Sequence, residues 1–299
     1  MIRAVFEGDI PSWSNPTVRT TRLAQWVAAG LNAVVLQVDI GFGATWPSTL
    51  MRQDPRIEGR TEPLRSCVDA CHAAGLSVVL DFACASYNAL AAIHPEYLLP
   101  NYFMPYYNYW DAGFQAWRSD TVAECAAYVD ADGVALDYLR TGREAMGSEA
   151  PASEVLQTFI GLVRSKVGAD YPLISVNHTN YIASHAEGVK VADWLTAGTV
   201  DKAVLFNYAV RFPSTVLASL DASKVWALAG NFDIVNGQVV KRAGREVAKD
   251  WRQIMRVAKP SAVAIYNANQ MTDDQALHMN VTQLAMSLMC PRYRGSLTE

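Results

Sequence analysis

AAGLNAVVLQVD (residues 28–39) and AAGLSVVLDF (residues 73–82) are two copies of one pattern in this chain. In each copy, the end of a helix reaches a glycine, and an uninterrupted apolar run follows with an aspartate at or next to its last position. A glycine at this point is typical of a left-handed helix cap. Because continuous apolar runs are typical of parallel strands buried on both faces, the repeat predicts an αβ unit.

Apolar runs of this kind occur eight times, with helical patterns between them. From Glu7 to Asn267 they advance 260 residues in seven steps, about 37 residues per step, which suits repeated strand–helix units. No stretch resembles an interdomain linker, so we expect the α/β class and a single (β/α)8 TIM barrel over residues 1–299. The runs are RAVFEG (3–8), AVVLQVD (33–39), SVVLDFA (77–83), GVALDYL (133–139), LISVNHT (173–179), KAVLFNY (202–208), VWALAG (225–230) and AVAIYNA (262–268).

Apolar stripes with glycine or proline stops predict the helices. The predicted ranges are 17–29, 61–74, 151–167, 242–259 and 272–289. The widest gap follows the third strand, where residues 93–117 are rich in aromatic residues and interrupted by prolines. This segment predicts a long aromatic loop on the face where barrels of this type place their active sites.

Composition excludes several classes of protein. The 25 Lys and Arg residues against 29 Asp and Glu residues give a net charge of −4 without a basic block, which argues against nucleic acid and anionic membranes as partners. The odd set of five cysteines lacks a Cys-x-x-Cys pair, so we expect free buried thiols, without a disulfide framework or a structural zinc site. We also expect no metal ion and no cofactor. The cysteines are Cys67, Cys71, Cys84, Cys125 and Cys290.

The start of the chain enters an apolar run directly, without a basic segment and a long apolar core. No stretch approaches the roughly 18 apolar residues of a membrane span. We therefore expect neither a signal peptide nor a transmembrane segment, and a protein that is cytoplasmic, virion-associated or released by lysis. The sequence carries no signal of oligomeric state.

Aspartates at the strand ends are the candidate catalytic residues. Glycoside cleavage uses two carboxyl groups, ~5–5.5 Å apart in retaining enzymes and ~6.5–9.5 Å apart in inverting ones. Asp137 is the first choice because it ends an otherwise apolar strand, where a charge is functional or costly. Asp81 and Asp39 are the candidates for its partner, and the residues do not separate the acid from the nucleophile.

Amides, tyrosines and tryptophans accompany these carboxylates, and such groups suit a ligand rich in hydroxyls. A carbohydrate is therefore the expected partner. The candidate substrate-binding residues are Glu7, Trp46, Trp110, Tyr138, Arg140, Asn177, His178, Asn207, Tyr208, Asp233, Tyr266 and Asn267.

Structural roles compete with these assignments. A strand-end aspartate often caps a helix or holds a loop amide. Arg140 can neutralise Asp137 instead of binding substrate. His178 can be a hydrogen-bonded residue of the barrel mouth, and the aromatic loop can be a small satellite core.

Four segments together resemble the glycosyl-hydrolase-like barrel proteins related to family ten of that provisional classification. They resemble more loosely the hydrolase domains that act on poly-N-acetylglucosamine-type exopolysaccharides. The segments are LNAVVLQVDIGFGATWPST (31–49), EPLRSCVDACHAAGLSVVLDF (62–82), IHPEYL (93–98) and YVDADGVALDYLR (128–140). The resemblance covers roughly the first half of the chain, and it implies a (β/α)8 fold and carbohydrate hydrolysis with Asp137 in the catalytic centre.

The fourth strand departs from one related pattern. Chitinase-type enzymes end the comparable strand with Asp-x-Glu, whereas this chain has Asp137, Tyr138 and Leu139. This difference disfavours their substrate-assisted mechanism. The leading hypothesis is a glycoside hydrolase for an oligo- or polysaccharide of cell-wall or exopolysaccharide type. The alternative is a barrel that binds carbohydrate without cleaving it, for example in a phage-tail or cell-wall assembly.

Overall fold

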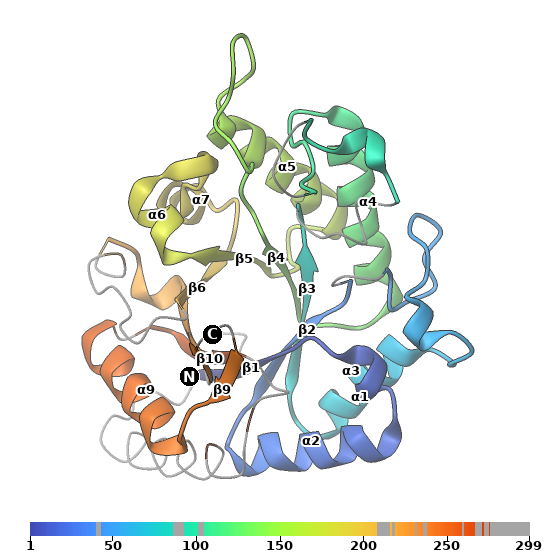
Figure 1. Cartoon of the computed structure of the whole chain (residues 1–299), viewed down its shortest axis with the longest axis vertical. Helices are drawn as coiled ribbons and strands as arrows, with labels where there is room; N and C mark the ends of the chain where they lie inside the picture. The colour runs from blue at the N-terminus through green and yellow to red at the C-terminus, as the bar shows by residue number, and fades with distance from the viewer. Residues whose placement is uncertain are drawn as a thin grey trace.

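Eight parallel strands close into a barrel in the computed structural model, and helices surround it (Figure 1). The structure describes residues 1–39, 43–85, 93–100, 105–207, 216, 219–230, 232–235, 238–258, 260–266, 271 and 275, without the side chains of residues 207, 232–235, 238–239 and 257–258. The strands are β1 (Ile2–Glu7), β2 (Ala33–Gln37), β3 (Ser77–Ala83), β4 (Gly133–Asp137), β5 (Leu173–His178), β6 (Lys202–Asn207), β7 (Val225–Gly230) and β10 (Ala262–Tyr266). Each corresponds to a predicted apolar run, so the (β/α)8 barrel is confirmed.

The barrel has an inner and an outer apolar core, because successive side chains of a strand point to opposite faces. Val79 and Ala135 belong to the inner cluster, and their neighbours Leu80 and Val134 belong to the outer one. Burial on both faces explains why the strands are continuously apolar. A polar side chain in an inner row must therefore lie inside the barrel or at its mouth.

Four predicted helices are present with small shifts at their ends: α2 (Pro16–Ala28), α3 (Pro63–Ala73), α5 (Ala152–Val167) and α9 (Gly244–Ala258). Gly30 and Gly75 follow two of them with φ of 72° and 76°, as the left-handed caps require. The predicted helix over 272–289 lies outside the described residues, apart from Gln275.

The structure adds several short elements. They are α1 (Ile10–Trp13), α6 (Thr179–Ser184), α7 (Val191–Ala197), an antiparallel pair of β8 (Phe232–Val235) and β9 (Gln238–Lys241), and 3-10 turns at Pro55–Ile57, Pro95–Tyr97, Ala186–Gly188 and Ala222–Lys224. Helix α6 directly follows β5 and brings a second layer of side chains to the barrel mouth.

The prediction of a loop throughout residues 93–117 is wrong at its end. Helix α4 (Ala112–Tyr128) begins inside this segment, and the Asp111 side chain caps it by accepting a hydrogen bond from the Phe114 backbone nitrogen at 2.9 Å. Phe114 and Trp117 lie on the buried side of α4, where the Phe114 ring stacks on Tyr107 with centroids 4.9 Å apart. These aromatic residues therefore form helix packing, which their composition alone does not distinguish from a loop.

The cysteines with described surroundings are buried free thiols, as predicted: Cys67, Cys71, Cys84 and Cys125. Burial raises the pKa of Cys67 to about 12. Thiols with such a raised pKa are inert near neutral pH, which fits a packing role.

Candidate active site

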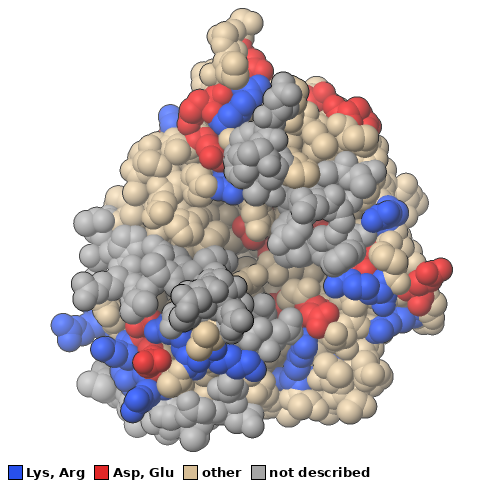
Figure 2. Space-filling view, in the orientation of Figure 1, with Lys and Arg blue, Asp and Glu red and all other residues tan. Residues whose placement is uncertain are grey.

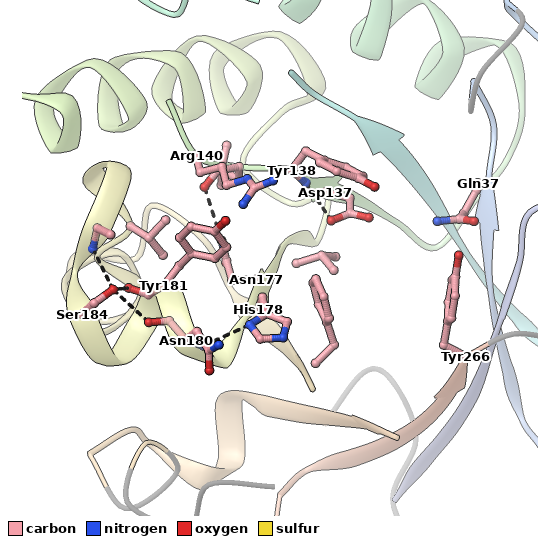
Figure 3. Close-up of a pocket in the computed structure, with 15 residues that line it drawn as sticks. Gln37, Asp137, Tyr138, Arg140, Asn177, His178, Asn180, Tyr181, Ser184 and Tyr266 are labelled. Atoms are coloured by element: carbon pink, nitrogen blue, oxygen red, sulfur yellow. Dashed lines mark hydrogen bonds between the residues drawn. The ribbon is translucent and has the colours of Figure 1, made fainter. Parts of the chain in front are cut away.

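A cavity of about 580 Å³ opens at the carboxyl ends of the barrel strands, within the size range of ligand sites (Figure 3). Figure 2 shows this face of the molecule hollowed near its centre. Polar residues from β2, from β4 and the turn after it, from β5 and α6, and from β10 line it: Gln37, Asp137, Tyr138, Arg140, Asn177, His178, Asn180, Tyr181, Ser184 and Tyr266. Val176 and Phe206 are among its apolar lining residues.

Strand alternation determines which strand-end residues face this cavity. Asp137 continues the inner row of Ala135, and Tyr266 packs against the inner cluster. Gln37 likewise continues the inner row of Val35. In Figure 3, Gln37 and Tyr266 lie on the side of the cavity opposite Tyr181, with Asp137 between the two sides. Side chains from distant parts of the chain thus converge on Asp137.

Asp137 carries a carboxyl group with an unusual affinity for protons. Burial raises its pKa to about 7, against the lowering effects of a hydrogen bond from the Tyr138 backbone nitrogen and of the Arg140 charge. That backbone nitrogen donates to Asp137 Oδ1 at 2.6 Å. Near pH 7 the group is therefore poised between its acid and base forms, as a catalytic acid or base requires.

The turn that follows Asp137 is strained. Tyr138 has a φ of 54°, an uncommon value for a bulky residue, and such strain persists where the surrounding structure enforces it. Tyr106 and Tyr109, both buried, support the turn from behind. The Tyr106 hydroxyl donates to the Arg140 carbonyl at 2.9 Å, and the Tyr109 hydroxyl donates to the Tyr138 carbonyl at 3.4 Å.

Asp81 lies beneath the cavity and does not line it. Its side chain is fully buried, and Oδ2 accepts a hydrogen bond from Gln37 Nε2 at 3.1 Å. Oδ1 has no hydrogen-bond partner among the described residues. Burial, and next the nearby charge of Asp137, raise the pKa of Asp81 well above its usual value. Both causes favour the neutral form of the Asp81 carboxyl over the ionised form, and they disfavour a state in which Asp81 and Asp137 are both negatively charged.

Asp39 forms a buried ion pair away from the cavity. Its Oδ2 lies 2.5 Å from Nη2 of Arg118, and both side chains are 0% exposed. Burial raises the pKa of Asp39, and the Arg118 charge opposes this rise. The same guanidinium donates to the Ala83 carbonyl at 2.8 Å, so the pair ties α4 to the end of β3. These contacts match a structural role for Asp39, which was the alternative to a catalytic role.

Glu7 is also placed outside the cavity lining. Its carboxylate lies 2.5 Å from Nη1 of Arg22 and accepts a hydrogen bond from the Asp9 backbone nitrogen at 2.7 Å. The side chain is fully buried, so no surface of Glu7 is open to a substrate. The contacts indicate that Glu7 holds the loop after β1 against α2.

The tryptophans predicted to bind substrate are not part of this cavity. Trp46 is fully buried, and its Nε1 donates to Glu124 Oε2 at 3.0 Å, so the side chain predicted to bind substrate has no surface open to one. Trp110 lines a separate cavity of about 630 Å³, where its Nε1 donates to the Ala150 carbonyl at 2.7 Å. Tyr106, Tyr107 and Tyr109 are buried as well and belong to the outer core cluster, so the described part of the aromatic segment packs on the outer core of the barrel.

His178 and Asn177 both line the cavity, but their side chains differ in orientation. His178 pairs with the inner residue Phe206, and its Nδ1 accepts from the Asn180 backbone nitrogen at 3.1 Å. Burial and the Arg140 charge lower the pKa of His178, so at neutral pH it presents Nε2–H as a donor. Asn177 pairs with the outer residue Leu205, and its Nδ2 donates to the Leu139 carbonyl at 3.3 Å.

Four predicted site residues have no described side chains. Tyr208 and Asn267 lie outside the described residues. Asn207 is the last residue of β6, and Asp233 lies within β8. Only the backbone of these two residues is described.

Sequence reasoning missed Gln37, the residues of α6 and Glu187. Gln37 is detectable, because it is the only polar residue before Asp39 in the run AVVLQVD and falls in register with Val35. Helix α6 has six residues, too few for a periodic signal. Glu187 has a φ of 54°, and its Oε2 lies 3.7 Å from Nε of Arg140. Its backbone oxygen accepts hydrogen bonds from the backbone nitrogen and the hydroxyl group of Thr141. These contacts stabilise the turn after β4.

Within the described part of the chain, no group of three or more His, Cys, Asp or Glu residues is arranged to hold a metal ion. No helix in that part of the chain has the length and apolar character needed to cross a membrane.

No protein-family model and no curated protein matches the sequence. The fold is similar to that of alpha-L-fucosidase isoenzyme 2 from Paenibacillus thiaminolyticus, with a TM-score of 0.68 at 12% identity over 96% of this chain and 49% of the fucosidase. The chain thus spans about half the length of that enzyme.

The similarity to two other solved structures extends over almost their entire chains. The glycoside hydrolase domain of PgaB (BpsB) from Bordetella bronchiseptica has a TM-score of 0.66 at 12% identity, over 93% of this chain and 98% of that domain. A chitinase from Rhizomucor miehei has a TM-score of 0.62 at 11% identity, over 95% of this chain and 100% of the chitinase. The chain therefore has the TIM-barrel fold of glycoside hydrolase domains, and at these identities the likeness concerns the fold alone.

Proposed function

We propose that this protein is a glycoside hydrolase that cleaves an oligo- or polysaccharide, of cell-wall or exopolysaccharide type, in the cavity at the barrel mouth. The observation that carries this proposal is the Asp137 carboxyl, which lines the cavity and has its pKa raised to about 7. A carboxyl with this pKa holds a proton at neutral pH and can transfer it to the glycosidic oxygen as the bond breaks.

The remaining lining residues suit a sugar. His178 Nε2–H, Asn180 and Ser184 can hydrogen-bond hydroxyl groups on one side of the cavity, and Gln37 and Tyr266 can do so on the other (Figure 3). The Phe206 ring offers an apolar surface between them. Similar folds in glycoside hydrolase domains support the same substrate class.

The direct test is a panel of neutral and acidic glycans incubated with the wild-type protein, with released reducing ends as the readout. We expect at least one glycan to be cleaved, with kcat/KM falling as pH rises through about 7, because Asp137 then loses the proton that it donates. Tight binding without any reducing ends would instead support the carbohydrate-binding alternative. One observation favours that alternative: Asp137 is the only carboxylate among the described lining residues.

Replacing Arg140 with glutamine tests the electrostatics of Asp137. The Arg140 charge lowers the pKa of Asp137, so its removal raises that pKa. The alkaline fall of kcat/KM then moves to higher pH, by up to about one unit. Arg143→Gln is the matched control, because Arg143 is paired with Glu149 outside the cavity lining. An alkaline fall that stays in place or moves to lower pH contradicts this assignment.

Asp81→Asn separates two roles for Asp81. Burial and the charge of Asp137 favour the neutral form of the Asp81 carboxyl, and an asparagine is also neutral and keeps an acceptor for Gln37. We expect kcat/KM to stay within about tenfold of wild type, whereas loss of an essential acid–base carboxylate costs about 10²–10⁴-fold. A loss as large as that of Asp137→Asn would show that Asp81 works as a charged catalytic carboxylate.

A further inference from the structure

Helix α9 carries a straight row of basic side chains on its exposed side. The helical period of about 100° per residue places them within about 60° of one another around the helix axis. Figure 2 shows Lys and Arg side chains gathered at the lower left, where Figure 1 places α9. The basic row consists of Arg245, Lys249, Arg252 and Arg256, which are all exposed.

The basic row is separate from the apolar and acidic residues of α9. Asp250 Oδ2 lies 2.6 Å from Nη2 of Arg242, and Glu246 Oε2 accepts a hydrogen bond from the Ala243 backbone nitrogen at 3.3 Å. Both acidic side chains of the helix therefore have partners outside the row. The side of α9 that packs on the barrel consists of buried residues: Val247, Ala248, Trp251, Ile254 and Met255.

The spacing of the row makes its charges repel one another. Like charges three or four positions apart on a helix destabilise it, and the members of the row are four, three and four positions apart. Within the described part of the chain, Arg245, Lys249 and Arg256 form no ion pair that would offset this repulsion. A polyanion bound along the row would relieve the repulsion, and the local positive potential would attract it although the chain as a whole has a net charge of −4.

The row begins at the end of the barrel where the cavity opens. The Arg242 guanidinium donates to the carbonyl of Gly230, the last residue of β7, at 2.9 Å, so the start of α9 lies at the carboxyl ends of the strands. Ser261, after the helix, donates from its backbone nitrogen to the carbonyl of Val225, the first residue of β7, at 2.9 Å. The row therefore runs from the mouth toward the opposite end of the barrel, over about 16 Å at 1.5 Å per residue.

We propose that the basic row of α9 is a binding surface for an acidic polysaccharide, which it holds along the outside of the barrel beside the mouth. This inference rests on the proposed function for the class of polymer, because the cavity proposed to cleave a glycan opens at the same end of the barrel. The row presents one cation about every 5.5 Å along the helix axis. An extended chain with one carboxylate on each sugar unit suits such a series of single charges.

The test is binding of the wild-type protein at pH 7 to polygalacturonate, to the neutral polymer dextran and to single-stranded DNA, measured by calorimetry. We expect polygalacturonate to bind at least about tenfold more tightly than dextran, and its affinity to fall as sodium chloride is added, because salt screens exposed charges. Equal affinities for polygalacturonate and dextran would overturn the proposal. Tighter binding of the DNA than of polygalacturonate would overturn the assignment of a polysaccharide as the partner.

Two triple variants locate the binding surface. The row variant combines Arg245→Gln, Lys249→Gln and Arg256→Gln, and we expect it to bind polygalacturonate at least about tenfold more weakly than wild type. The matched control removes the same charge outside α9, through Arg52→Gln, Arg65→Gln and Lys166→Gln. We expect the control to keep most of the affinity. The melting temperature shows that each variant is folded.

An equal loss of affinity in both triple variants would overturn the proposal, because the attraction would then depend on the overall charge and not on α9. Unchanged binding in the folded row variant would overturn it as well. Binding is measured without turnover, so row-dependent binding without cleavage of any glycan contradicts only the proposed hydrolysis. Cleavage of a glycan without row-dependent binding contradicts only this inference.

Discussion

Asp137→Asn is expected to lower kcat/KM by about 10²–10⁴-fold on any glycan that the wild-type protein cleaves. Asparagine has nearly the same shape and keeps an acceptor for the Tyr138 backbone nitrogen, so the strained turn is retained. It has no proton to give to a leaving oxygen. Reducing-end release measures the loss, and the melting temperature shows that the fold is kept.

Asp132→Asn is the matched control for this experiment. Asp132 immediately precedes the same strand at the opposite end of the barrel, where its Oδ2 accepts from the Val78 backbone nitrogen at 2.7 Å. Its replacement leaves turnover per folded molecule unchanged. If Asp137→Asn retained wild-type turnover, Asp137 could not be the proton donor, and hydrolysis in this cavity would need another acid.

Arg118→Met is expected to be the most destabilising single change considered for this protein. It leaves the fully buried Asp39 carboxyl without its cation, and breaking a buried ion pair from one side costs about 3–5 kcal/mol of unfolding free energy. Urea denaturation followed by circular dichroism measures this loss. The double variant Asp39→Leu with Arg118→Met recovers part of the stability, because no buried charge is left unpaired.

The exposed pair of Arg65 and Glu62 provides the comparison. Both side chains are more than 40% exposed, so Arg65→Met changes stability little. Comparable effects of Arg118→Met and Arg65→Met would contradict the structural role of the buried pair. An Asp39→Asn variant that stays folded but loses turnover as fully as Asp137→Asn would return Asp39 to the catalytic candidates.

Strand and site were predictable to different degrees. The eight strands can be predicted because each strand is buried on both faces, and its sequence is therefore a continuous apolar run. The inward orientation of Asp137 follows from the same alternation that places Ala135 in the inner core. That alternation also identifies Gln37 as an inward polar residue, although the initial choice of strand-end aspartates passed over it.

Other features depend on contacts that composition does not encode. Asp39 stands at a strand end like Asp137, but its partner Arg118 lies 79 residues away on α4. Trp46 is a loop residue whose burial depends on Glu124 and Phe82. Helix α6 is too short to show a period, yet it supplies Tyr181, the ring on which Arg140 rests. Contacts between residues far apart in the sequence therefore determine which of the chemically suitable residues line the cavity.

The most direct measurement is an NMR titration of the Asp137 carboxyl carbon, assigned by comparison with Asp137→Asn. This experiment needs no knowledge of the substrate. We expect an apparent pKa of about 7, coinciding with the alkaline fall of kcat/KM once a substrate is found. A carboxyl that titrates near 4, the ordinary value for aspartate, would contradict the assignment of Asp137 as the proton donor.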